Sequence, residues 1–468
     1  MLKFLNKIFK LEENKTTVKT ELIAGLTTFF AMCYIIVVNP NQMTGFEALP
    51  EIWNACFVGG ILAAVIATLC MAFIANKPFA LAAGMGLNSF FYVSFILPNL
   101  LTNPNDGYKA GLAVILLSGI VFLILSLTGI RKYLAYNLPQ CLKTAIPAGI
   151  GLFITFIGFQ NCGLVVPNQY TGVSIVDFTV GASAAVPAII GLVGFILVIV
   201  LSNSKNSLIK STSMISSILI CTALYYLCVL VFEMDIYITS TSLKESFSNW
   251  AELGLFGAFE GLGLIFNGGI LGSIFSVIML VITYCLVDMF DTLGTLYGAS
   301  MEAGMLDENG DPTDLEKEML CDSIGTAAGS ILGTSTITTF VESSAGVAAG
   351  GRTGLSSLVT SILFLLCLFI APLAQYVPSC ATAPALIYVG LLMSKNILNI
   401  DFKDPRSAAT GFITFVMMVI TYSISNGIML GAITYVIISF LTKKFTKKDI
   451  VILIIAVLGI LRFAFIAM

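Results

Sequence analysis

Apolar runs that repeat from one end of the chain to the other constrain its fold more than any other feature. A helix needs about 20 apolar residues to cross the hydrocarbon core of a bilayer. Only 10% of the 468 residues are charged, against about a quarter in soluble domains. The sequence therefore predicts an all-α polytopic membrane protein. Its twelve clearest runs, each long enough to span or half-span a bilayer, lie near residues 22–40, 53–75, 109–128, 144–161, 184–201, 213–232, 270–298, 319–333, 354–376, 383–395, 407–422 and 427–441.

Two shorter, glycine-rich runs, 79–97 and 336–350, bring the expected number of transmembrane spans to about fourteen. A last run, 449–466, is left over, and its pattern fits either an extra span or a helix in the membrane interface. The N-terminal stretch 1–21 mixes lysines and acids with apolar residues and lacks the long apolar region of a signal peptide. We expect it to be an amphipathic lead-in.

Lysines and arginines set the predicted orientation, because cytoplasmic loops are enriched in them. With fourteen spans, five basic groups fall on one side, which places the N-terminus in the cytoplasm of a multi-pass cell-membrane protein. The acidic loop 233–260 would be external and the loop 302–318 cytoplasmic. The basic groups are Lys3, Lys7, Lys10, Lys15 and Lys19; Arg131, Lys132 and Lys143; Lys205 and Lys210; Lys395, Lys403 and Arg406; and Lys443, Lys444, Lys447 and Lys448.

The two halves of the chain resemble each other. The segments 145–161 and 382–398 share an alanine-proline start and an apolar body, and the segments 78–91 and 336–349 are both short and rich in small residues. If the chain is split near 235–255, the second pair is third in each half. Seven spans per half is an odd number, so the halves insert with opposite orientation. Such inverted repeats are typical of secondary transporters, whose binding site lies at paired glycine-interrupted segments.

Composition excludes several other functions. The chain contains no histidine, which removes the commonest zinc ligand and the usual catalytic base. Its 11 cysteines lie mostly singly in apolar runs, without a CxxC pair, as small hydrophobic residues do. No basic patch suits a nucleic acid. We therefore expect no metal, no cofactor, no nucleic-acid partner and no enzymatic activity, and any proton chemistry must use other residue types.

Few charges lie within the predicted spans, where each costs at least about 2.5 kcal/mol. They are Asp288, Asp291 and Glu342, with Arg352 and Arg462 near span ends. Asp288 and Asp291 are three residues apart and can share one helix face. Each carboxylate has a structural alternative: the aspartates could bond to neighbouring hydroxyls, and Glu342 could cap the helix that follows it, or both cap and bind a ligand.

Asn88 is open to two interpretations as well. An asparagine in a membrane helix often bonds to another helix, but this one follows Gly84 and Gly86, where the backbone can be extended. A broken helix exposes N–H and C=O groups, which is tolerated only beside protein or a cavity. Small residues let a flat ligand approach. The stretch around Glu342 therefore suggests half of a substrate site, with Asp291 on another helix as the other half.

Four motifs resemble the signature segments of AzgA-like purine permeases, in the nucleobase–cation symporter-2 (nucleobase–ascorbate) superfamily. They are TTFFAMCYIIVVNP, PFALAAGMGLNSFF, VDMFDTLGTLYG and TTFVESSAGVAAGGRTGLSSLVT, and the resemblance runs from about residue 4 to 440. It implies fourteen spans in two inverted repeats of seven, with short extended segments in spans 3 and 10. It also implies a core domain from 1–128 and 255–376 and a gate domain from 129–235 and 377–441. The apolar segment 442–468 has no counterpart.

The resemblance also implies a substrate site between spans 3 and 10. The family's carboxylate of span 8 falls on Asp291, its glutamate of span 10 on Glu342, and its asparagine of span 3 on Asn88. Thr295 falls where pyrimidine-transporting relatives have a histidine. The predicted substrate-binding residues are Asp291, Glu342, Asn88, Thr295, Ser343 and Met85, and the predicted proton-coupling residues are Glu342, Asp291 and Asp288.

These observations predict a secondary transporter that imports purine nucleobases, such as hypoxanthine, guanine or adenine, by proton symport and alternating access. The nearest alternative is the same fold with uracil, xanthine or a small anion as cargo, and an ion channel or a membrane enzyme is a more distant one. The sequence leaves open the preferred purine, the affinity, Na⁺ in place of H⁺, and the oligomeric state, a homodimer included.

Overall fold

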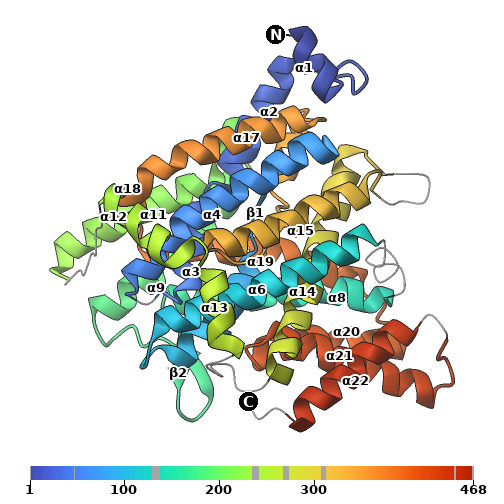
Figure 1. Ribbon diagram of the computed structural model, residues 1–468. Helices are drawn as coiled ribbons and strands as arrows, with labels where there is room; N and C mark the ends of the chain where they lie inside the picture. Colours follow the sequence, from blue (N-terminus) through green and yellow to red (C-terminus); the bar gives the residue numbers. More distant parts are fainter. Residues whose placement is uncertain are drawn as a thin grey trace.

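The computed structural model describes residues 2–46, 48–128, 138–234, 242–266, 274–306, 312–446 and 449–465 (Figure 1). Its first half contains α1 (Leu2–Phe9), α2 (Val18–Met32), α3 (Ile35–Met43), α4 (Pro50–Cys70), β1 (Leu81–Ala83), α5 (Met85–Phe91), α6 (Pro104–Leu127), α8 (Gln140–Asn161), β2 (Val165–Asn168), β3 (Gly172–Ile175), α9 (Ala182–Ser202), α10 (Ser207–Ser211) and α11 (Ser213–Phe232).

The second half begins with α12 (Leu243–Asn249) and α13 (Gly257–Phe266). It continues with α14 (Ile274–Ala303), α15 (Leu315–Leu332), β4 (Ile337–Thr339), α16 (Ser343–Ala348), α17 (Gly354–Leu366), α18 (Ala371–Ala374), α19 (Ser379–Ser394), α20 (Pro405–Ile420), α21 (Ile424–Leu441) and α22 (Ile450–Phe465). In the described part of the chain, nine helical segments are long and apolar enough to cross a membrane. This confirms a helical multi-pass membrane protein, while the number of fourteen spans stays a prediction.

Several helices begin where the sequence offers a cap. The side chain of Asn103 accepts a hydrogen bond from Asn105 N at the start of α6, and Pro104 follows it. Asp404 and Pro405 repeat this arrangement at α20. A side chain of this kind satisfies an N–H group that has no partner inside the helix, and proline tolerates the first helical position because it has no N–H group.

Each of the two glycine-rich segments contains a short extended stretch, as predicted. Strands β1 and β4 pair antiparallel, with Leu81 opposite Thr339 and Ala83 opposite Ile337. All six strand residues are buried. The pairing satisfies backbone groups that would otherwise lack partners at the point where two membrane helices are interrupted. Helices α5 and α16 begin directly after the two strands and lead away from them.

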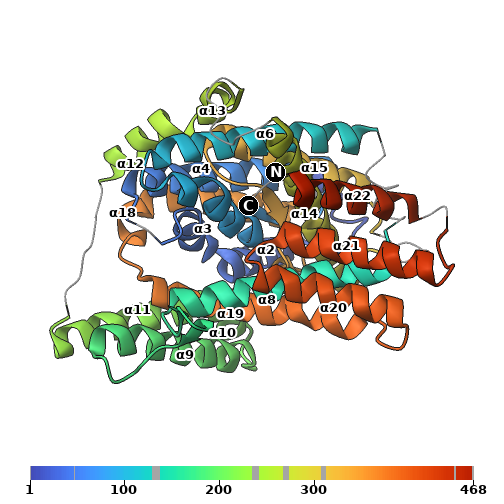
Figure 2. The ribbon, with the colours of Figure 1, turned by 90° about the horizontal axis from the view of Figure 1, so that it is seen from below.

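The helices form two groups on either side of this strand pair. In Figure 2, α8, α9, α11, α19 and α20 lie together along one side, while α4, α6 and α15 lie on the other. Within the first group α8 packs against α19 and α20, and within the second α15 packs against α4 and α6. Helices α5 and α14 contact α8 and so connect the two groups.

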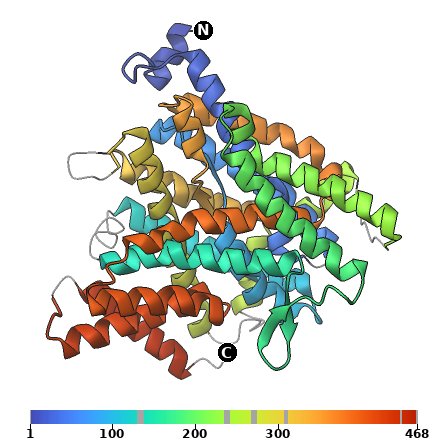
Figure 3. The same cartoon turned by 180° about the vertical axis from the view of Figure 1, so that it is seen from behind.

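Part of the predicted external loop 233–260 is helical. Ser242 caps α12 by accepting from Glu245 N, which is the serine-to-glutamate spacing of a capping box that the apolar pattern did not reveal. The hairpin of β2 and β3 projects from the helices (Figure 3). The leftover apolar run 449–466 forms α22, which packs against α21.

Candidate substrate-binding site

Serine and backbone groups hold the strand pair in place. Ser343 Oγ accepts a hydrogen bond of 3.0 Å from Ala80 N, and Phe340 N donates to Ala80 O at 3.0 Å. Gly84 N donates to Thr336 O at 2.9 Å. These bonds tie the start of α16 to β1, so Ser343 has a positioning role and lies outside the cavity lining described next.

A cavity of about 210 Å³ lies beside the strand pair. One wall comes from α14, α5 and the segment from β4 to α16, and the other comes from α8, α19 and the short helix after α19. The cavity therefore lies between the two groups of helices. Its lining residues are Met85, Gly86, Pro147, Ile154, Asp291, Thr295, Thr338, Thr339, Phe340, Val341, Glu342, Val389, Leu392, Met393 and Asn396.

Asp291 lines this cavity from α14 and is only 8% exposed. Among the described residues, its carboxylate has no hydrogen-bond partner. One turn further along α14, the Thr295 hydroxyl donates to Asp291 O at 3.1 Å and to Thr292 O at 2.9 Å. Thr295 therefore has its oxygen available as an acceptor. A buried carboxylate without a donor is costly, and a ligand N–H group would relieve that cost.

Glu342 is the second carboxylate on the cavity and is 9% exposed. It occupies the position before α16, but its side chain makes no capping bond there. Its Oε1 atom instead accepts a hydrogen bond of 2.6 Å from Tyr34 OH. Of the roles left open for it, the structure thus excludes side-chain capping of α16.

Tyr34 is a functional candidate that the sequence did not reveal. It is fully buried and lies at the break between α2 and α3. Its hydroxyl also lies 3.8 Å from Met85 Sδ, so it connects both broken segments. Tyr34 sits within the motif TTFFAMCYIIVVNP, but a tyrosine among phenylalanines in a membrane span is usually read as packing.

Asn88 does not line the cavity. It is fully buried, and its amide donates to Asn39 Oδ1 at 2.9 Å and to Gln42 Oε1 at 3.4 Å. Its Oδ1 atom accepts a short hydrogen bond from Ser335. This geometry is that of a polar link between α5, α3 and the segment before β4, the first of the two interpretations of this residue.

Asp288 also lies away from the cavity lining. Thr326 Oγ1 of α15 donates to Asp288 Oδ2 at 2.8 Å. A hydroxyl chain beside it starts at the cavity, because Thr338 Oγ1 and Thr292 Oγ1 lie 2.9 Å apart and Thr292 Oγ1 donates to Asp322 Oδ1 at 2.7 Å. Asp288 and Asp322 therefore each accept a hydrogen bond from a threonine hydroxyl. Of the three aspartates, Asp291 is the one that lines the cavity.

The cavity contains features that suit a small polar ligand. The Thr339 hydroxyl is buried without a hydrogen-bond partner among the described residues. The opposite wall, from α8 and α19, is apolar except for Asn396. In the part of the chain that the structure describes, no three His, Cys, Asp or Glu side chains are grouped as metal ligands. The site can thus bond to a ligand edge on one wall and pack against its body on the other.

Residues 19–430 match the sequence model of a protein family described as "Permease family". The adenine permease AdeP of Escherichia coli is 36% identical over 462 residues, which cover 99% of this chain and 96% of that one. The guanine/hypoxanthine permease PbuO of Bacillus subtilis is 36% identical over 456 residues, covering 96% and 98%. The guanine/hypoxanthine permease GhxP of E. coli O157:H7 is 33% identical, covering 97% and 95%.

Solved structures share the fold at low sequence identity. The transmembrane domain of the cyanobacterial bicarbonate transporter BicA matches with a TM-score of 0.59 and 14% identity, covering 86% of this chain and 95% of that one. The structure of SLC26A9 matches with a TM-score of 0.55 and 14% identity, covering 92% and 67%. These similarities confirm the architecture of a membrane transporter and extend to the fold alone.

Proposed function

Because the chain belongs to the nucleobase–cation symporter-2 family of permeases, we propose that it carries purine nucleobases across a cell membrane by proton symport. The names of its relatives support the cargo: adenine for one, guanine and hypoxanthine for two others. Together these relatives leave the choice between adenine and the oxopurines to experiment.

The observation that carries the proposal is a pair of buried carboxylates on one cavity. Asp291 and Glu342 come from different elements and are each less than a tenth exposed. A purine has a flat ring with N–H donors and ring acceptors along its edge. Carboxylates accept from N–H groups, charge-assisted hydrogen bonds are the stronger kind, and the free Thr339 hydroxyl can donate to a ring acceptor. The apolar wall of α8 and α19 would cover the ring.

The same site argues against an anion as cargo. Bicarbonate is transported by one protein that shares this fold, so the fold leaves an anion open. However, two carboxylates on the cavity would repel an anion, and the described residues of its lining include no lysine or arginine. Uracil and xanthine are neutral enough to fit the same chemistry, and competition between bases distinguishes them from hypoxanthine, guanine and adenine.

Proton coupling is proposed for the cavity carboxylates themselves. The chain has no histidine, and Tyr34 and Glu342 are already joined by a hydrogen bond of 2.6 Å. A proton that binds Glu342 changes the charge next to the bound base, so the binding of the proton and of the base must influence each other reciprocally. Asp291 is the second proton-coupling candidate, and Asp288, bonded to Thr326, is the third.

Alternating access is proposed for the two groups of helices. The core domain would comprise residues 1–128 and 255–376, and the gate domain 129–235 and 377–441. The cavity has walls from both, so a rigid-body movement of one against the other would open it to either side in turn. Its lining follows α19 from Val389 to Asn396, beyond the end of the helix.

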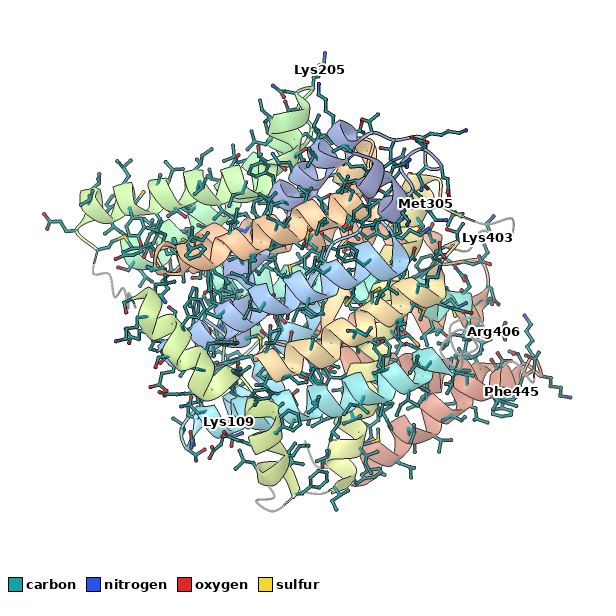
Figure 4. The ribbon with its side chains drawn as sticks, turned by 45° about the horizontal axis from the view of Figure 1, so that its top comes forward. Lys109, Lys205, Met305, Lys403, Arg406 and Phe445 are labelled. Atoms are coloured by element: carbon teal, nitrogen blue, oxygen red, sulfur yellow. The ribbon has the colours of Figure 1, made fainter. Side chains whose placement is uncertain are left out.

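An N-terminus in the cytoplasm is proposed from the basic residues. Figure 4 places Lys205, Met305, Lys403 and Arg406 toward one end of the helices, and Lys109 toward the other. Lys109 bonds to Glu260 Oε2 at 2.5 Å. The larger basic set would then be cytoplasmic, as the distribution of positive charge in membrane proteins requires, and the end with Lys109 external.

Uptake of labelled hypoxanthine into proteoliposomes tests the proposal. With an acidic exterior we expect accumulation that collapses when a protonophore is added. Unlabelled adenine and guanine should compete, and uracil should compete weakly. Uptake that survives the protonophore and follows a Na⁺ gradient would show a different coupling ion. Absence of uptake and of binding for all purines would refute the proposed cargo.

A further inference from the structure

A second cavity, which we call the outer cavity, lies at the other end of α19. Its volume is about 260 Å³, and its lining includes Asn41, Thr44, Trp53, Gln375 and Ser379. Ser379 begins α19, whereas Val389 and Met393 of the same helix line the central cavity. Ten residues separate Ser379 from Val389, which is about 15 Å along a helix. The two cavities are therefore distinct sites on one element.

The outer cavity lies on the same seam between the two groups of helices as the central cavity. Asn41, Thr44 and Trp53 come from α3, its end and α4, and Ser379 comes from α19. Helix α3 starts next to Tyr34, which bonds to Glu342 at the central cavity. Helices α3 and α19 contact each other. A ligand in the outer cavity would thus lie on the route that opens into the central cavity when α3 and α19 separate.

The chemistry of the lining suits a flat, neutral ligand. Trp53 Nε1 donates to Asn41 Oδ1 at 2.6 Å, so Asn41 keeps its amide N–H groups for another partner. The Trp53 ring is stacked on Phe57, with centroids 5.2 Å apart and an angle of 16°, and this contact fixes its orientation. Aromatic rings are good platforms for other flat rings.

Hydroxyl groups complete the outer cavity. The Thr44 hydroxyl donates to Pro40 O at 3.0 Å, which leaves its oxygen as an acceptor. The Ser379 hydroxyl has no hydrogen-bond partner among the described residues. None of the lining residues that the structure describes is ionisable, in contrast to the central cavity. The described part of the outer cavity therefore offers donors, acceptors and an aromatic edge.

We propose that the outer cavity is a separate binding site for the purine nucleobase, occupied before the base enters the central cavity. This inference rests on the proposed function, since it assigns the same cargo to a second place. The base would bind here first and meet the coupling carboxylates only after α3 and α19 separate.

The chain provides an optical probe of this site, because it contains only two tryptophans, Trp53 and Trp250. Trp250 lines neither cavity, and its Nε1 atom donates to Leu332 O at 2.8 Å. In the full chain with Trp250→Phe, all tryptophan emission comes from Trp53. Titration with hypoxanthine should then give a saturable change in emission. The matched Trp53→Phe variant, which keeps Trp250, should give none.

A change transmitted from the central cavity must be distinguished from binding in the outer one. We therefore expect the Trp53 signal to persist when Asp291→Asn is added, although binding of labelled hypoxanthine to the central site is lost. If the signal weakens in parallel with that binding, Trp53 reports the central site and the proposal is wrong. If Trp53 stays silent while hypoxanthine is bound and transported normally, the outer site alone is refuted. If hypoxanthine is neither bound nor transported, the proposed purine transport is refuted, and the outer site is refuted with it.

Asn41→Asp tests the polar contact, because it retains the oxygen that accepts from Trp53 and removes the amide donor. Losing one hydrogen bond should raise the half-saturating hypoxanthine concentration of the Trp53 signal by about 2- to 12-fold. In vesicles of defined orientation, the half-saturating concentration should rise for transport that starts from the Ser379 end and stay unchanged from the opposite end. Equal changes from both ends, or none, would contradict the proposal. Asn168→Asp is the matched control, since Asn168 Oδ1 also accepts a bond, from Tyr170 N, on an exposed hairpin.

Discussion

Replacing Glu342 by glutamine should separate binding of the base from its accumulation. The amide has the same shape, and its oxygen can still accept the hydrogen bond that Tyr34 OH donates to Oε1 at 2.6 Å. The amide cannot take up a proton. We therefore expect Glu342→Gln to bind hypoxanthine and to exchange it across the membrane, and to lose accumulation that depends on the proton gradient.

Two magnitudes follow from the structure. A charged acceptor contributes about 1 kcal/mol more to a hydrogen bond than a neutral one, so the Kd for the base should rise about fivefold. One proton moving with a neutral base gains about 2.3 kcal/mol from a potential of 100 mV, which supports an accumulation of about 50-fold. The variant should fall from about 50-fold accumulation to equal concentrations on both sides, a far larger change than the loss of affinity.

Equilibrium binding and proteoliposome uptake should be measured on one preparation, with the membrane potential imposed by a potassium gradient. Glu252→Gln, at an exposed glutamate outside the cavity lining, is the matched control and should behave as the wild type. If Glu342→Gln still concentrates hypoxanthine in a pH-dependent way, the coupling group is another residue, with Asp291 and Asp288 next in order. If it neither binds nor exchanges the base, Glu342 is needed for binding itself and the separation argued here is wrong.

Four further changes have distinct expected outcomes. Asp291→Asn should abolish transport while membrane levels stay near normal, because its carboxylate faces the cavity and supports no bond within the described structure; wild-type uptake would remove it from the site. Tyr34→Phe removes the hydrogen bond that Tyr34 OH donates to the Glu342 carboxylate, so the pH dependence of uptake should change, with an unchanged pH profile as the contrary result. Asn88→Ala should lower the free energy of unfolding by about 1–3 kcal/mol and leave the competition profile unchanged; an altered order of competing bases would instead make Asn88 a substrate contact. Lys77→Met should lower the free energy of unfolding by about 3–5 kcal/mol, because Lys77 Nζ lies 3.2 Å from Asp314 and 3.9 Å from the fully buried Glu318. Thermal unfolding measures this loss, and Lys317→Met, at an exposed lysine, is the control.

The sequence predicted the extended segments and the cavity carboxylates for the same physical reason. Charged and glycine-rich stretches are expensive inside a membrane, so they stand out against apolar runs wherever they are retained. This cost marked β1, β4, Asp291 and Glu342 before any geometry was known. It marked Asp288 equally, although Asp288 bonds to Thr326 outside the cavity lining. The free-energy cost of a charge inside the membrane indicates that the residue is needed, but it does not indicate whether its side chain faces the cavity.

The residues that the sequence did not reveal have no such cost. Val389 and Met393 form the apolar wall of the cavity, but apolar residues on a membrane helix occur equally on surfaces that face lipid. Tyr34 is fully buried, and only the position of its hydroxyl against Glu342 gives it a role. For Asn88 the sequence left two interpretations, and its partners Asn39 and Ser335 lie far away in the chain. Pairing across such separations depends on the tertiary fold.

Close packing indicates where the two groups of helices can move. A Cβ atom at Gly151 of α8 would lie 2.7 Å from Gly390 O of α19, and one at Gly390 would collide with Thr155. Such contact between backbones leaves no room for sliding, so α8 and α19 should move as one rigid unit. The outer and central cavities both lie where this unit faces α3, α5 and the β4–α16 segment. In the alternating access proposed above, movement at this seam would open one cavity as it closes the other. The base and the proton proposed to accompany it would then meet between α8–α19 and the carboxylates without a continuous path across the membrane.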